Sequence, residues 1–160
     1  MSSPAPSPLL SAPAPRKRIL WKWSLGATLC VLTFFMWECG SSLVQGRGLS
    51  NAAVDRFHGQ LNANNYSAIY AEADERFRRS ISQEDFLQFL GAVHKKLGDS
   101  NSQTLTNLNV QAMTNGTFLT ASYQTKYARG QAQETFTWVK DGPSLKLVSY
   151  NVNSRALIIQ

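Results

Sequence analysis

The C-terminal part of this 160-residue chain alternates apolar and polar residues, and glycine turns interrupt the alternation. A period of two is typical of β-strands that bury one face, and glycine beside Asn or Asp favours a tight turn. The turns Ala128-Arg129-Gly130 and Lys140-Asp141-Gly142 therefore predict strands that fold back on one another. With a further turn at Asn115-Gly116, the pattern predicts an antiparallel sheet of four strands: 104–113, 118–127, 133–140 and 145–152.

Three helices are expected before the sheet, with Ser50, Asn65 and Ser82 as their N-caps. The third has the clearest pattern, because apolar residues recur at helical spacing and Gly98 follows as a stop signal. The charged stretch 72–79 is interpreted as a helix end and loop. The residues expected to be buried are Ala53, Val54, Phe57 and Leu61 in the first helix and Phe86, Leu90, Val93 and Leu97 in the third. The predicted fold class is α+β, with three N-terminal helices packed on a curved four-stranded antiparallel sheet.

A short apolar segment near the N-terminus predicts a membrane anchor. Residues 19–37 can cross a bilayer if Lys22 reaches the headgroups, and tryptophans stand near both ends of the segment. The basic run Arg16-Lys17-Arg18 favours a cytoplasmic N-terminus, which leaves the rest of the chain outside. The alternative is a signal peptide that is cleaved near Gly40-Ser41-Ser42. The predicted organisation is a disordered Pro-rich cytoplasmic tail (1–18), a transmembrane helix (19–37), a linker (38–49) and an extracytoplasmic domain (50–160).

Several motifs within residues 50–160 resemble a known superfamily. They are Asn65-Tyr66, Ser82 with Phe86, Tyr123-x-Thr125-x-Tyr127, Glu134-x-Phe136-x-Trp138 and the run 145–151. In these motifs the chain resembles the nuclear transport factor 2-like (cystatin-like) superfamily of cone-shaped α+β domains. More closely, it resembles a family of uncharacterised bacterial proteins that are exported or membrane-anchored. The resemblance implies a bacterial inner-membrane location and a concave sheet that holds a ligand, binds a partner or is filled by side chains.

A site inside the sheet would centre on Glu134, whose strand neighbours on the same face are apolar. Apolar surroundings raise the pKa of a carboxyl group, and a nearby tyrosine could donate a hydrogen bond to an anion. The isomerase-type members of the superfamily need this combination. The candidate pocket or partner face consists of Tyr123, Tyr127, Glu134, Phe136, Trp138 and Tyr150.

The favoured interpretation of Glu134 is nevertheless structural. A carboxylate just after a turn is usually exposed at the strand end, or it pairs across the hairpin with Lys126 or Arg129. His58 and His94 are expected to be isolated, and His94 to be exposed, so no metal site is predicted. The basic residues are dispersed and phosphate-binding motifs are absent from the sequence. We therefore predict no catalytic residue, no cofactor and no nucleic-acid partner.

The predicted function is a membrane-anchored binding or assembly module, not an enzyme, whose partner is another envelope protein or a copy of itself. One alternative is a small-molecule-binding protein or enzyme that uses the cone interior with Glu134. Another is a scaffold of a secretion system. The interior separates the first two interpretations: a roomy pocket at Glu134 favours a ligand, whereas a filled interior favours the module. The side chains expected to fill it are Phe57, Phe86, Leu97 and Trp138.

Overall fold

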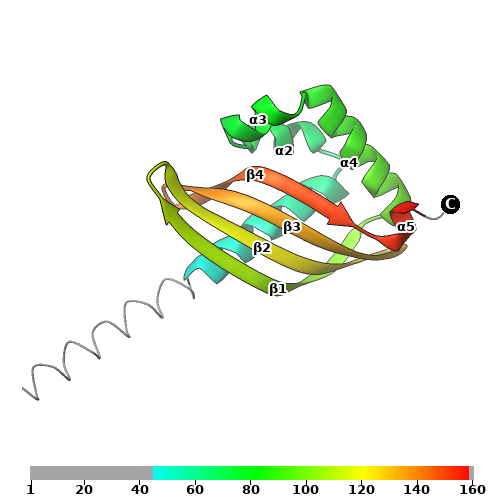
Figure 1. Ribbon diagram of the computed structural model, residues 1–160. Coiled ribbons are helices and arrows are strands. Elements are labelled where there is room, and N and C mark those ends of the chain that lie inside the picture. The colour runs from blue at the N-terminus through cyan, green and yellow to red at the C-terminus, as the bar shows by residue number, and fades with distance from the viewer. Residues whose placement is uncertain (1–44, 159–160) are drawn as a thin grey trace, which may run out of the picture. The chain divides into compact units, whose positions relative to one another are not determined.

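The computed structural model describes residues 45–158, which form helices followed by one sheet. A helix spanning residues 45–62 comes first and is called the first helix below. Figure 1 shows that it runs along one face of the sheet, which is called the inner face. The other elements are α2 (Tyr66–Glu72), α3 (Glu75–Ser80), α4 (Gln83–Leu97), β1 (Ser100–Met113), β2 (Gly116–Tyr127), β3 (Gly130–Asp141), β4 (Ser144–Asn153) and α5 (Arg155–Ile158).

The sheet is an antiparallel meander in which the strands pair in chain order, from β1 to β4. The predicted strands and their order are confirmed, and each strand is longer than its alternation alone indicated. Register pairs such as Tyr123 with Glu134 and Phe136 with Tyr150 place the inner-face residues of neighbouring strands opposite one another. The first hairpin turns at Thr114 and Asn115, one residue earlier than predicted, because Gly116 already pairs with Met113. Gly116 has a positive φ of 133°, a conformation that glycine adopts at little cost.

Helix α4 begins and ends where its sequence signals predict. The hydroxyl group of Ser82 accepts a hydrogen bond from the backbone N–H of Asp85, so Ser82 is the N-cap. Gly98 follows the helix with a φ of 76°. The Arg129 side chain, from the loop between β2 and β3, donates to the carbonyl groups of His94, Lys95 and Lys96 at the end of α4. These bonds satisfy carbonyls that have no partner within the helix.

The boundaries of the other helices correct the sequence-based predictions. Residues 45–49 are helical and not a linker, so Ser50 lies inside the first helix and is not its N-cap. Asn65 makes no side-chain hydrogen bond that caps α2. The stretch expected to be a helix end and loop contains α3, whose N-cap is Asp74. Four helical segments therefore precede the sheet within residues 45–158, instead of three, and α5 follows it.

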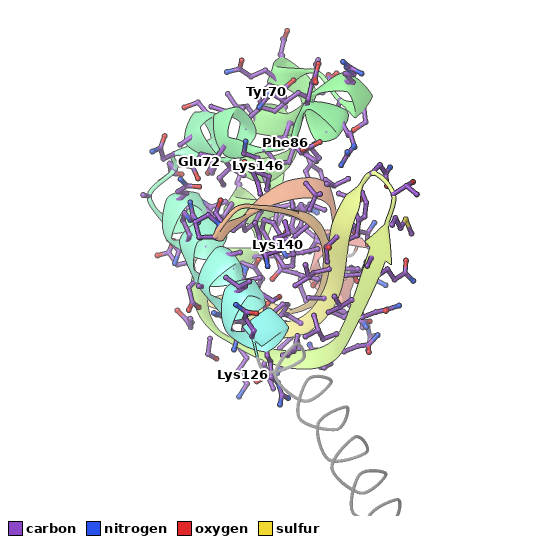
Figure 2. The ribbon with its side chains drawn as sticks, turned by 90° about the vertical axis from the view of Figure 1, so that its left-hand side faces the viewer. Tyr70, Glu72, Phe86, Lys126, Lys140 and Lys146 are labelled. Carbon is purple, nitrogen blue, oxygen red and sulfur yellow. The ribbon has the colours of Figure 1, made fainter. Side chains whose placement is uncertain are left out.

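The core lies between the helices and the inner face of the sheet. The apolar stripes predicted for the first helix and α4 are buried, and so are Phe57, Phe86, Leu97 and Trp138. Figure 2 shows side chains filling the space enclosed by the first helix and the curved sheet. The α+β class and the four-stranded antiparallel sheet with helices are thus confirmed.

The predicted tail (1–18), the transmembrane helix (19–37) and the alternative cleavage position (40–42) lie outside the described residues and stay predictions. Within residues 45–158, no helix has both the length and the apolar character needed to cross a bilayer.

Candidate functional site

Glu134 of β3 is the centre of a buried polar cluster on the inner face, and its exposed fraction is 0%. Its Oε1 accepts hydrogen bonds from the hydroxyl groups of Tyr127, at 2.8 Å, and Tyr150, at 2.6 Å. Its Oε2 lies 2.9 Å from Nε2 of His58 and accepts a bond from the hydroxyl group of Thr125. The strand pairing brings β2, β3 and β4 together here, and the first helix supplies His58 from above the sheet.

This environment keeps Glu134 ionised. Burial raises the pKa of its carboxyl group, but the hydrogen bond and charge of His58, with hydrogen bonds from Thr125 and Tyr150, outweigh burial, so the pKa is lowered. Burial and the neighbouring Glu134 carboxylate raise the pKa of both Tyr127 and Tyr150, which therefore stay protonated donors. Since the carboxylate can only accept, His58 donates through Nε2. Its Nδ1 is buried and has no hydrogen-bond partner among the described residues.

The favoured structural interpretation of Glu134 was wrong about where its side chain lies and what it pairs with. The residue is neither exposed at the strand end nor paired with Lys126 or Arg129, because its side chain points to the inner face beneath the first helix. His58 was expected to be isolated, but its imidazole pairs with the Glu134 carboxylate. A signal for His58 was present in the sequence: it belongs to the buried helical stripe of Val54, Phe57 and Leu61, at spacings of three and four residues.

The structure brings together all six residues of the predicted candidate face, because the Phe136 ring packs on the rings of Tyr123, Trp138 and Tyr150. Tyr127, Glu134 and Tyr150 meet through hydrogen bonds. Phe136 and Trp138 stack on one another, with ring centroids 5.4 Å apart and ring planes within 9° of parallel. The hydroxyl group of Tyr123 does not bond to Glu134. It lies 2.8 Å from the Ser50 hydroxyl group and donates to the Asn51 side chain.

The Glu134 carboxylate itself is closed off from solvent. Its carboxylate oxygens already accept four hydrogen bonds, and neither cavity described below is lined by Glu134. A buried polar network whose acceptor is fully satisfied makes the packing of the core specific. Glu134 thus ties the first helix to three strands.

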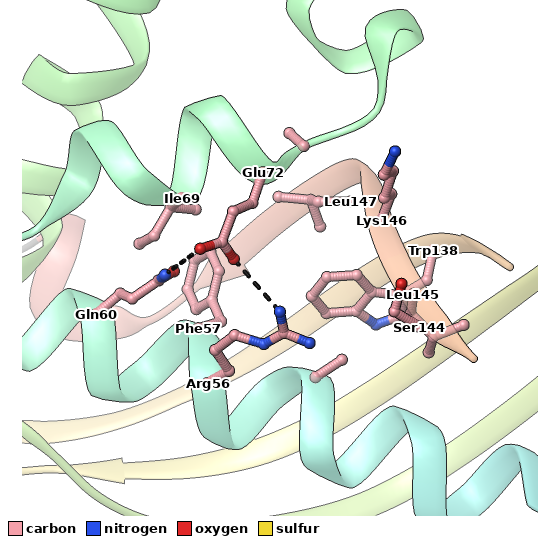
Figure 3. Close-up of a pocket in the computed structure, with 12 residues that line it drawn as sticks. Arg56, Phe57, Gln60, Ile69, Glu72, Trp138, Ser144, Leu145, Lys146 and Leu147 are labelled. Carbon is pink, nitrogen blue, oxygen red and sulfur yellow. Dashed lines mark hydrogen bonds and ion pairs between the residues drawn. The ribbon is translucent and has the colours of Figure 1, made fainter. Parts of the chain in front are cut away.

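A cleft opens beside this cluster, between the first helix, α2 and the β3–β4 hairpin (Figure 3). Its volume is about 170 Å³. The walls are mostly apolar side chains, of which solvent reaches only a few per cent. If it were sealed and empty, a void of this size would cost up to about 4 kcal/mol, at ~24 cal/mol per Å³. The apolar lining consists of Ala53, Phe57, Ile69, Ala73, Trp138, Leu145 and Leu147.

Charged and amide groups surround the mouth of this cleft. Glu72 of α2 accepts a hydrogen bond from the Gln60 amide, at 2.9 Å, and pairs with Arg56 at 3.5 Å (Figure 3). Lys146 of β4 also lines the cleft, while its ammonium group pairs with Asp141. The side chains of Arg56, Glu72 and Lys146 are each about half exposed. The indole Nε1 of Trp138 is buried without a hydrogen-bond partner in the described part of the chain.

A second cavity, of about 360 Å³, lies at the end of α4 and is lined largely by polar residues. His94 was expected to be exposed, but only 13% of its side chain is. Its Nε2 lies 2.7 Å from Asp99, and its Nδ1 lies 2.8 Å from the Tyr66 hydroxyl group and 3.0 Å from the Asn64 side chain. Burial and the charge of Asp99 raise the pKa of Tyr66, so its hydroxyl group stays protonated. These contacts tie the helix ends together.

No group of three or more His, Cys, Asp or Glu residues within residues 45–158 is arranged to hold a metal ion. Residues 53–150 match a family described as proteins of unknown function (DUF4019), over more than half of the chain. The chain belongs to the DUF4019 family. The region matched to DUF4019 contains the whole Glu134 cluster. It also contains every residue that lines the first cleft, the one beside Trp138, which is called the Trp138 cleft below. No curated protein matches the sequence.

Proposed function

We propose that this protein is a membrane-anchored, extracytoplasmic binding module without catalytic activity, and that the cleft beside Trp138 is its binding site. The observation that carries the proposal is the complete burial of Glu134 under four hydrogen bonds. The carboxylate that a cone-interior enzyme would use is thereby committed to holding the fold. Among the cavities described, the cleft is the one with an apolar lining suited to binding.

The domain arrangement and the location are part of the same proposal. A meander sheet with helices on its inner face supports a cone-shaped domain of the nuclear transport factor 2-like kind. Residues 19–37 form the anchor, with the N-terminus in the bacterial cytoplasm. The partner is an envelope protein or a second copy of the chain, which the anchor holds close to the membrane.

A photo-crosslinking experiment in the producing cells tests the binding site. A photoreactive amino acid replaces Lys146, which lines the cleft, or Gln111, an exposed residue of β1 away from it, in the full-length chain. We expect a discrete adduct from position 146 and none from position 111. The mass of the adduct distinguishes an envelope protein, a second copy and a small molecule. Equal labelling at both positions, or no adduct at position 146, would contradict the proposal.

A further inference from the structure

We propose that the Trp138 cleft recognises a carboxylate attached to one apolar group about the size of an aromatic ring. This inference rests on the proposed function, because it names the ligand chemistry of the same cleft. The apolar group occupies the space beside Phe57 and Trp138, and the carboxylate pairs with Arg56 at the mouth.

The size and lining of the cleft determine the apolar part. A cavity of about 150 Å³ lined by apolar side chains holds a benzene molecule, and this cleft measures about 170 Å³. Larger ligands need pockets of roughly 300 Å³ or more. Phe57, Trp138 and Leu147 present aromatic and aliphatic surface to the space, and none of them is more than 4% exposed. The cleft therefore fits one ring or one branched apolar side chain.

The mouth of the cleft already holds a carboxylate, that of Glu72. Its two partners, Gln60 and Arg56, lie one turn apart on the first helix and present an amide and a guanidinium group to it. A half-exposed ion pair between two long side chains contributes little to stability. A ligand carboxylate can therefore displace Glu72 from Arg56 at low cost, and Arg56 then holds the ligand through a charge-assisted hydrogen bond.

The Arg56 guanidinium group is what favours an anion over a neutral or cationic ligand at this cleft. Arg56 and Lys146 are positive and Glu72 is negative, but Lys146 is already paired with Asp141, so Arg56 is the cation that a ligand meets once Glu72 is displaced. A neutral analogue of the ligand would leave the Arg56–Glu72 pair intact and lose this attraction.

Two sources supply this chemistry: a free aromatic acid, or the C-terminal residue of a protein that ends in an apolar side chain. Binding of 4-fluorophenylacetate and 4-fluorophenylacetamide to the full-length protein in micelles is measured by ¹⁹F NMR, with empty micelles as the blank. The peptide Ala-Ala-(4-fluorophenylalanine), with a free carboxylate or as its amide, provides the second arm and is followed by the same ¹⁹F signal. We expect the acid to bind at least about fivefold more tightly than the amide in the arm that represents the true source.

Variants of the two mouth residues should change the affinity in opposite directions. Arg56→Gln should weaken binding of the acid at least about fivefold, and Glu72→Gln should strengthen it, because the competing carboxylate is gone. Arg155→Gln removes an exposed positive charge on α5, outside the cleft, and should leave affinity unchanged. Thermal unfolding of each variant shows that it is folded.

Equal affinity for acid and amide in both arms, or unchanged affinity of Arg56→Gln, would overturn the inference. The crosslink at position 146 separates this failure from that of the proposed function. If position 146 gives an adduct while neither acid binds, the ligand class is wrong and the binding site stands. If position 146 gives no adduct and neither acid binds, both proposals fail.

Discussion

Glu134 illustrates, at the scale of single residues, how a fold makes a buried charge tolerable. An isolated carboxylate in a protein interior is strongly disfavoured, and it persists where hydrogen bonds and an opposite charge replace water. Three hydroxyl groups and one imidazole do so here, and they come from β2, β4 and the first helix. Since Glu134 itself lies on β3, the cluster forms only where these three elements and β3 pack together.

Replacing the carboxylate by an amide tests this role. We expect Glu134→Gln to lower the free energy of unfolding by about 1–3 kcal/mol, because the amide group turns a donor toward groups that themselves donate. Urea unfolding of the full-length protein in micelles measures the change. Glu84→Gln, at an exposed position on α4, is the control and should change the stability by less than about 0.5 kcal/mol. A similar small effect of both variants would show that the cluster is not a structural tie.

The lowered pKa of Glu134 predicts an acid-sensitive contribution to stability. A carboxyl group whose pKa is lower in the folded state than in the unfolded state stabilises the fold above the unfolded value of about 4.3, and this contribution is lost as the pH falls through the folded value. The difference in unfolding free energy between the wild type and Glu134→Gln should therefore be larger at about pH 5.5 than below about pH 4, where it shrinks. Unfolding curves over this range measure it. A difference that grows toward low pH would contradict the assignment of an ionised Glu134.

At the scale of elements, the end of α4 and the loop between β2 and β3 hold each other in place. The backbone N–H of Arg129 donates to the Leu97 carbonyl, and that of Ala128 donates to the Asp99 carbonyl. Gly98 lies between these contacts with a positive φ, and a Cβ atom there would come within 3.0 Å of the Ala128 Cβ atom. The close approach of helix and hairpin thus requires glycine for two reasons, its backbone conformation and the lack of space.

Two glycine variants should have effects of opposite sign. Gly98→Ala should lower the unfolding free energy by at least about 1 kcal/mol, because alanine is strained at positive φ and meets Ala128. Gly59→Ala should raise it by about 0.5–1 kcal/mol, because Gly59 is exposed within the first helix and a Cβ atom there meets nothing within 4 Å. Thermal and urea unfolding measure both. Stabilisation by Gly98→Ala would show that α4 and the hairpin are not in close contact.

At the scale of the whole molecule, the helices and the sheet form two layers with one core between them. The inner face of the sheet is closed by the first helix and α4, and a small cleft remains where the first helix, α2 and the β3–β4 hairpin meet. For this reason we propose binding at the cleft, and not catalysis, as the function of the domain. The proposed anchor would present the cleft outside the membrane.

The anchor makes a prediction about the mature protein. If residues 19–37 are retained, the protein extracted from membranes should have the mass of the full chain, 17.8 kDa. Mass spectrometry of the purified native product measures this, and alkaline carbonate should leave the protein in the membrane fraction. A product that lacks about forty residues would show that the segment is a cleaved signal peptide.

Much of the fold could be predicted from local patterns, whereas of the residues that line the cleft only Trp138 was among the predicted site residues. The stripe of α4, its Ser82 cap and the alternation of β2 each reflect physics that acts within a few residues, namely backbone hydrogen bonds and the burial of one face. Helix α3 was missed because its apolar contribution to the core is a single buried residue, Phe77. The extension of the first helix to residue 45 was missed because glycines at 46 and 48 have low helix propensity.

The sequence by itself determined the α+β class, the strand order and the buried stripes of the first helix and α4, because these follow from periodicity and turn chemistry. Only the tertiary structure decided the state of Glu134 and the place of the cleft. His58 and Glu134 are 76 positions apart, and Arg56, Glu72 and Lys146 come from three separate elements. Charges and hydrogen bonds between such residues depend on how layers pack, and no local pattern carries that information.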